Sequence, residues 1–79
     1  MKTPRNLSAQ DLIKILLKYG YEVTRQKGSH IRLTLHSENG DHHVTVPNHD
    51  LLRLGTLSSI LTDIAEHLNI DKEDILNKL

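Results

Sequence analysis

The segment Lys27-Gly28-Ser29-His30 holds the residues of this chain best suited to chemistry on a phosphate. Gly28 allows a tight turn, and successive backbone N–H groups in such a turn can meet a phosphate oxygen. A solvent-facing histidine at the start of the next strand can pass protons near pH 7. Arg32 shares the face of His30 on that strand, where its charge can stabilise a phosphorane-like transition state. The simpler interpretation is a hairpin whose second strand happens to begin with a histidine.

Four of the six histidines, His36, His42, His43 and His49, gather around a second hairpin and the loop after it. His36 and His43 are expected on one face, which suggests a metal between them. The chain has no Cys, and no acidic ligand clearly converges on the pair, so we predict no metal site and no cofactor. Asp41-His42-His43 matches the name motif of a phosphoesterase superfamily, but that chemistry needs a much larger scaffold than 79 residues supply.

Ten Lys and Arg balance ten Asp and Glu, which argues against attachment to nucleic acid by bulk charge alone. Residues 1–55 carry eight basic side chains against five acidic ones, and residues 56–79 carry two against five. The basic part can meet a polyanion while the acidic tail faces elsewhere, although small proteins often divide charge this way by chance. Six basic side chains are candidates for a phosphate-binding surface, unless they form an ordinary solvated exterior: Lys14, Lys18, Arg25, Lys27, Arg32 and Arg53.

Helical signals predict a first helix over 9–19. Ser8 is the expected N-cap, forming a capping box with Asp11, and Gly20 suits the left-handed residue that ends a helix. Its apolar positions are Leu12, Ile13, Leu16, Leu17 and Tyr19.

A second helix is expected after a loop over 47–55, with Thr56 as its N-cap and Asn69 at its end. The N-terminus at Gly55-Thr56 can hold a phosphate or can simply be a loop exit and cap. Asp71 and Asp74 resemble the start of a short terminal helix, whose apolar stripe is Ile75, Leu76 and Leu79.

Three segments alternate apolar and polar residues and predict strands over 21–26, 30–36 and about 42–46. The turn Lys27-Gly28-Ser29 joins the first two, and Asn39-Gly40 is a hairpin signal between the last two. The face expected to be buried carries Tyr21, Val23, Ile31, Leu33, Leu35, Val44 and Val46. The face expected to stay open carries Thr24, Gln26, His30, Arg32, Thr34, His36, His43 and Thr45.

The order of elements is α-β-β-β-α plus a helical tail, and it predicts a single α+β domain over 1–79. A three-stranded antiparallel sheet can be buried on one face and wet on the other, so we expect both long helices on one face. This is the architecture of double-stranded-RNA-binding domains. No run approaches the roughly 18 apolar residues of a membrane span, and the N-terminus lacks the apolar region of a secretory signal. We therefore expect a cytoplasmic protein with no membrane partner.

Several short segments, in order, resemble the HicA toxin family of toxin–antitoxin modules. They are Ser8-Ala9-Gln10-Asp11-Leu12-Ile13, Gly20-Tyr21-Glu22, Gln26-Lys27-Gly28-Ser29-His30, Val44-Thr45-Val46-Pro47-Asn48-His49, Gly55-Thr56-Leu57 and Ser59-Ile60-Leu61. The chain departs from the family pattern at Leu54 and Ser58, where members commonly carry a basic residue.

The resemblance implies a double-stranded-RNA-binding-like fold, a ribonuclease that cleaves messenger RNA, and a HicB antitoxin that covers the active site. It places the catalytic histidine at His30, with Gly28 and Ser29 in the same motif. We expect Lys27 and Arg32 to hold phosphate, with Lys14, Lys18 and Arg25 as further RNA contacts. The free toxin is expected to be a monomer.

The leading hypothesis is therefore a metal-independent endoribonuclease in which His30 is general base or general acid. The alternative is a small RNA-binding domain of the same fold without catalysis. A third interpretation is a domain whose main work is protein contact, with the antitoxin as one such partner.

Overall fold

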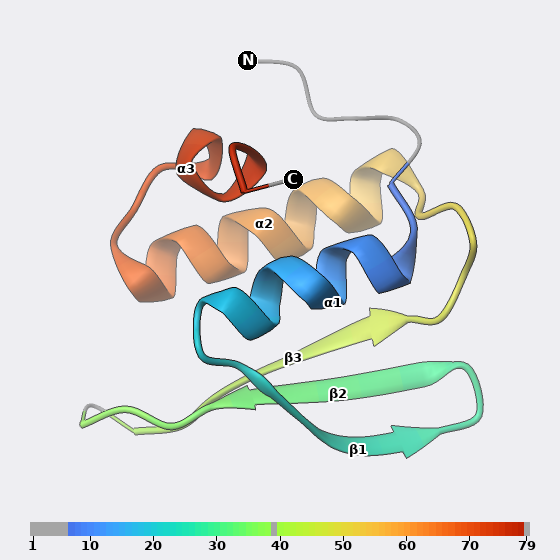
Figure 1. Cartoon of the computed structure of the whole chain (residues 1–79), viewed down its shortest axis with the longest axis horizontal. Helices are drawn as coiled ribbons and strands as arrows, with labels where there is room; N and C mark the ends of the chain where they lie inside the picture. Colours follow the sequence, from blue (N-terminus) through green and yellow to red (C-terminus); the bar gives the residue numbers. More distant parts are fainter. Residues whose placement is uncertain (1–6, 39, 79) are drawn as a thin grey trace.

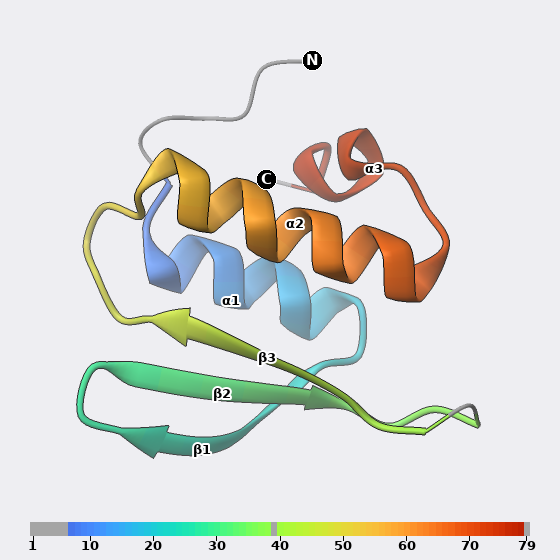
Figure 2. The ribbon, with the colours of Figure 1, turned by 180° about the vertical axis from the view of Figure 1, so that it is seen from behind.

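A computed structural model describes residues 7–38 and 40–78 of the chain and has two layers, a sheet and a set of helices (Figure 1). All the helices lie on one side of the sheet, and the other side is open (Figures 1 and 2). The elements in chain order are α1 (Ala9–Lys18), β1 (Glu22–Lys27), β2 (His30–Leu35), β3 (His42–Pro47), α2 (Leu54–Leu68) and α3 (Lys72–Leu76). The predicted α+β order and the one-sided helical cover are thus confirmed.

Helix α1 begins and ends as its sequence predicts. The Ser8 hydroxyl accepts from the Asp11 N–H at 3.1 Å, and the Asp11 carboxylate accepts from the Ser8 N–H at 3.3 Å. At the other end, Gly20 has a φ of 98°, and the N–H groups of Gly20 and Tyr21 donate to the last helical carbonyls. This pair of bonds is the Schellman arrangement. It reverses the chain from the helix into β1.

The antiparallel sheet has the order β1-β2-β3, so β2 is central. A bulge interrupts β1 between Val23 and Arg25. A bulge adds one residue to a strand and shifts the faces of the residues beyond it. As a result Gln26 pairs with Ile31, on the covered side, and not on the open face as strict alternation predicted.

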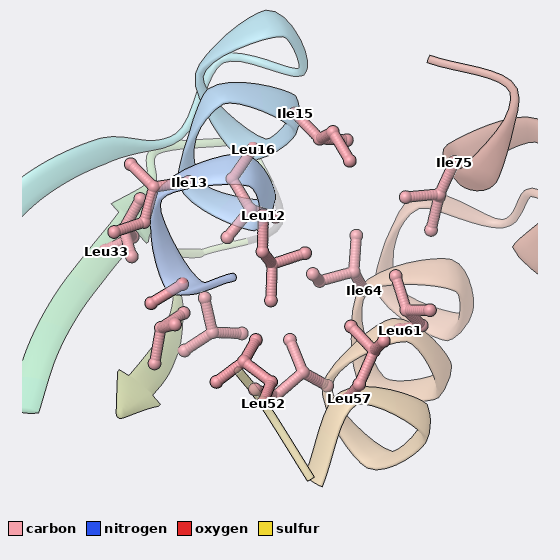
Figure 3. Close-up of a cluster of buried hydrophobic side chains, with 14 of the residues drawn as sticks. Leu12, Ile13, Ile15, Leu16, Leu33, Leu52, Leu57, Leu61, Ile64 and Ile75 are labelled. Atoms are coloured by element: carbon pink, nitrogen blue, oxygen red, sulfur yellow. The ribbon is translucent and has the colours of Figure 1, made fainter. Parts of the chain in front are cut away.

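The core fills the space between the helices and the covered face of β2 and β3 (Figure 3). From β2, Leu33 is fully buried, and from the helices Leu12, Leu61 and Ile64 are too. Ile15, which the expected apolar stripe omitted, is also buried because α1 packs toward α3 as well as toward the sheet.

Two residues expected in the core are exposed. Leu17 is 50% exposed and Val23 is 49% exposed. Val23 lies on the edge strand β1, beyond the reach of helices that sit over β3 and β2 (Figure 1). The apolar face of the sheet is therefore confined to β2 and β3.

Helix α2 begins earlier than predicted. Its N-cap is Arg53, without a side-chain cap bond, so Gly55 and Thr56 lie inside its first turn and the loop after β3 ends at residue 53. Asn69 ends the helix in the left-handed conformation, as predicted, with a φ of 57°.

The short helix α3 begins after Asp71 as expected, and Asp71 takes the N-cap position without making a side-chain cap bond. Ile75 and Leu76 are buried as predicted. Asn39 of the hairpin signal and Leu79 of the terminal stripe lie outside the described residues.

Candidate functional site

The open face of the sheet gathers four basic or imidazole side chains at one end. Lys27 pairs with His30, and Arg25 pairs with Arg32, across β1 and β2. Paired residues of an antiparallel ladder share a face, and His30 and Arg32 alternate with the buried Ile31. We call these four residues, Arg25, Lys27, His30 and Arg32, the cationic end. The bulge in β1 creates it, because it turns Arg25 and Lys27 onto this face.

The turn that presents His30 has two central residues, Gly28 and Ser29, with a φ of 57° at Gly28. A positive φ at the first central residue is typical of a II′ hairpin turn, which favours glycine there. The Asn48 N–H donates to the Ser29 carbonyl at 2.6 Å, and the Ala9 N–H donates to the His49 carbonyl at 3.0 Å. The loop after β3 therefore ties the turn to the start of α1.

The four side chains of the cationic end are free to meet a ligand. All four residues are exposed. Within residues 7–38 and 40–78 none of their side chains makes a hydrogen bond or an ion pair. Their positive charge is therefore not neutralised by the neighbouring residues that the structure describes.

The other end of the open face is internally paired. His36 contacts the carboxylates of Asp41 at 2.9 Å and Glu22 at 3.3 Å. The hydrogen bond and charge of Asp41, with a smaller effect of Glu22, raise the pKa of His36. His43 bonds through Nδ1 to the Thr34 hydroxyl at 2.8 Å, and Thr34 is 2% exposed beneath its neighbours.

Lys14 and Lys18 were predicted to be RNA contacts of the same site as His30. They lie on α1, which packs against the covered face of the sheet (Figure 2). They line a small hollow of about 130 Å³ together with Lys78, and Lys18 donates to the Lys78 carbonyl at 3.3 Å. The structure therefore separates these two lysines from the cationic end. Gly28 and Ser29 remain beside His30.

A cluster around His42 was not given any role from the sequence. Its Nδ1 lies 2.6 Å from the Tyr21 hydroxyl and its Nε2 lies 3.3 Å from Asp63 Oδ1. The ring stacks on His67 with centroids 4.2 Å apart. Burial, and then the charge of Asp63, raises the pKa of Tyr21 to about 12. Asp63 and His67 lie on α2, far along the chain from Tyr21 and His42, so the four residues come together only in the folded structure.

Among the described residues, no group of three or more His, Cys, Asp or Glu side chains is arranged to hold a metal ion. No helix in the described part of the chain is long and apolar enough to span a membrane.

Taken together, the fold and the site define a small α+β domain that backs a three-stranded sheet with helices and exposes a histidine among three cations. The model of the family described as the HicA toxin of bacterial toxin–antitoxin modules matches residues 9–65. The chain belongs to this toxin family, and its membership implies an antitoxin partner. The searches of curated proteins and of solved structures return no match to this chain.

Proposed function

We propose that this toxin is a metal-independent endoribonuclease that cleaves messenger RNA, with His30 as its proton-transfer residue. The observation that carries the proposal is the cationic end. There an exposed imidazole, which has no partner among the described residues, lies across the strand pair from Lys27 and two residues from Arg32. A histidine beside cations is suited to proton transfer at a phosphodiester, because the cations stabilise the charge that develops on its oxygens.

In the proposed reaction the ribose 2′-OH attacks the adjacent phosphorus and the bond to the 5′-oxygen breaks. The products are a 2′,3′-cyclic phosphate and a 5′-hydroxyl. His30 takes the proton of the 2′-OH as general base, or gives a proton to the leaving 5′-oxygen as general acid. Water completes the other transfer. One such positioned group contributes roughly 10²–10⁴-fold to the rate.

We further propose that a HicB-type antitoxin neutralises the toxin by covering the open face. Its support is that this face has no helix over it in the structure described (Figure 1), and that no described residue neutralises the charge of its cationic end. An antitoxin with an acidic contact surface would complement that end. We expect the free toxin to be a monomer.

The test is to incubate the purified protein with an RNA and with its all-2′-deoxy counterpart, both in excess chelator. The proposal predicts RNA fragments that end in 2′,3′-cyclic phosphate and 5′-hydroxyl groups, and an intact DNA counterpart. An RNA that stays intact but bound would indicate the non-catalytic RNA-binding domain instead. Cleavage of both polymers, or fragments with other end groups, would contradict the mechanism.

A further inference from the structure

The open face carries a hollow of about 300 Å³ that shares two arginines with the cationic end but does not include His30. Arg25 and Arg32 line one side, and His36, Asp41 and His43 line the other. Ligand pockets in proteins begin at about this size. The hollow therefore has room for a single nucleotide-sized group.

The position of the hollow relates it to the cut site. Arg32 lies two residues from His30 along β2, and Thr34, which pairs with His43, lies four residues from it. At about 3.3 Å per residue these separations are roughly 7 Å and 13 Å. An RNA strand that places one phosphate at His30 and runs along β2 therefore lays a neighbouring nucleotide over the hollow.

A chain of three hydrogen bonds beneath the hollow ends at Nδ1 of His43. The Thr24 hydroxyl donates to the Arg32 carbonyl at 3.4 Å, and a carbonyl can only accept. When all three bonds form at once, each hydroxyl has a single proton to give, so Thr34 donates to Thr24 over 2.9 Å. In that arrangement the Thr34 oxygen accepts from Nδ1–H of His43.

In that arrangement a neutral His43 ring carries its proton on Nδ1 and a lone pair on Nε2. Among the described residues, no group bonds to that Nε2. The neighbouring acceptor, Asp41, is already paired with His36. The hollow therefore combines two cationic donors with one free acceptor nitrogen.

His43 also borders a larger groove of about 500 Å³ between β3 and α2, but that groove is lined by Asp63 and Glu66. Two carboxylates repel a phosphate, whereas Arg25 and Arg32 attract one. The charges therefore direct a nucleotide to the hollow on the open face.

We propose that this hollow is the subsite for a nucleotide flanking the cut phosphate, and that His43 selects a base with an N–H donor. In this subsite Arg25 and Arg32 hold the phosphate of the flanking nucleotide, while Arg32 also faces the cut phosphate. His43 Nε2 accepts from an amino group of the base. The inference rests on the proposed function, since it names a subsite of the same RNA-binding face.

The test is equilibrium binding, measured by fluorescence anisotropy on a non-cleaving His30→Ala background. The probes are a short oligoadenylate and the same oligonucleotide built from unsubstituted purine, which lacks the amino group. We expect an added His43→Ala substitution to weaken oligoadenylate binding about tenfold, the effect of one lost hydrogen bond, and to leave the purine probe unaffected. Thr34→Val, which removes the hydroxyl that holds the ring, should reproduce part of the loss.

Equal weakening for both probes, or no weakening for either, would overturn the subsite while leaving RNA binding at the cationic end intact. If the His30→Ala protein with His43 in place binds neither probe, the RNA-binding function itself fails, and the subsite fails with it. Because the assay needs no cleavage, a catalytically silent protein would not be mistaken for a missing subsite.

Discussion

The two faces of β2 differ in burial and in charge. Ile31 and Leu33 point into the core and are almost fully buried, while His30 and Arg32 alternate with them and are exposed. The helices cover the first set and leave the second set free (Figure 1). Stability and chemistry are therefore assigned to alternate residues of the same strand, and substitutions at neighbouring positions should separate them.

The largest effect on stability is expected from Leu33→Ala. Leu33 is fully buried, and truncation of such a side chain costs about 2–5 kcal/mol because it loses apolar burial and leaves a cavity. Its neighbour Arg32 is exposed, so Arg32→Ala should change the free energy of unfolding by no more than about 0.5 kcal/mol. Urea denaturation of both variants measures the difference, and equal costs would show that the faces are not divided in this way.

The next effect concerns RNA affinity. Arg25→Ala should weaken binding to RNAs of different sequence by similar factors, and should reduce the slope of log affinity against log salt by about 1. The matched control is Lys14→Ala, because Lys14 lies on α1 behind the sheet. A larger effect of Lys14→Ala in the salt titration would show that RNA binds on the helical side of the domain, which would contradict the proposed site.

The sequence was sufficient for the elements that local rules govern. The capping box of α1, the turn at Gly28 and the alternation of β3 were predicted and found, because caps, turns and strand faces depend on neighbouring residues. The alternation of β2 holds from His30 to Leu33, but Thr34, which was expected to be open to solvent, is buried. His30 was placed correctly on the open face for the same reason.

Other features of the molecule depend on long-range packing. The bulge in β1 was missed, and with it the position of Arg25 beside Arg32, because one extra residue leaves no mark on composition. Lys14 and Lys18 were grouped with the site by charge alone, although α1 holds them behind the sheet. The His42 cluster also joins β3 to α2, two segments far apart in the chain.

A smaller effect is expected behind the sheet at Tyr21. Tyr21→Phe removes the hydroxyl that lies 2.6 Å from His42, and one hydrogen bond contributes about 0.5–1.5 kcal/mol. Because burial raises the pKa of Tyr21 to about 12, the folded state keeps this proton longer than the unfolded chain does. Stability should therefore fall from about pH 10 to 12 in the unmutated protein, and the fall should be shallower in Tyr21→Phe. Thermal melts across this range, with ultraviolet titration of tyrosine, measure both.

The smallest effect belongs to His36 at the paired end of the open face. Its pKa is raised above the ordinary value of 6.5, chiefly by the hydrogen bond and charge of Asp41. The contribution of His36 is thus fully present below pH 6.5 and is lost as the pH rises through the raised pKa. His36→Gln should flatten the melting temperature between pH 6 and 8, and a slope unchanged from the parent protein would contradict the pairing.

The central claim, that His30 performs proton transfer, is tested most directly by comparing two histidine variants in one RNA cleavage assay. His30→Ala should lower the single-turnover rate about 10²–10⁴-fold with an unchanged melting temperature, because its ring makes no hydrogen bond within the described residues. The matched control is His67→Ala, since His67 is also exposed but lies on α2, on the covered side of the sheet, and this variant should cleave at the parent rate. Undiminished cleavage by a folded His30→Ala protein would contradict the account.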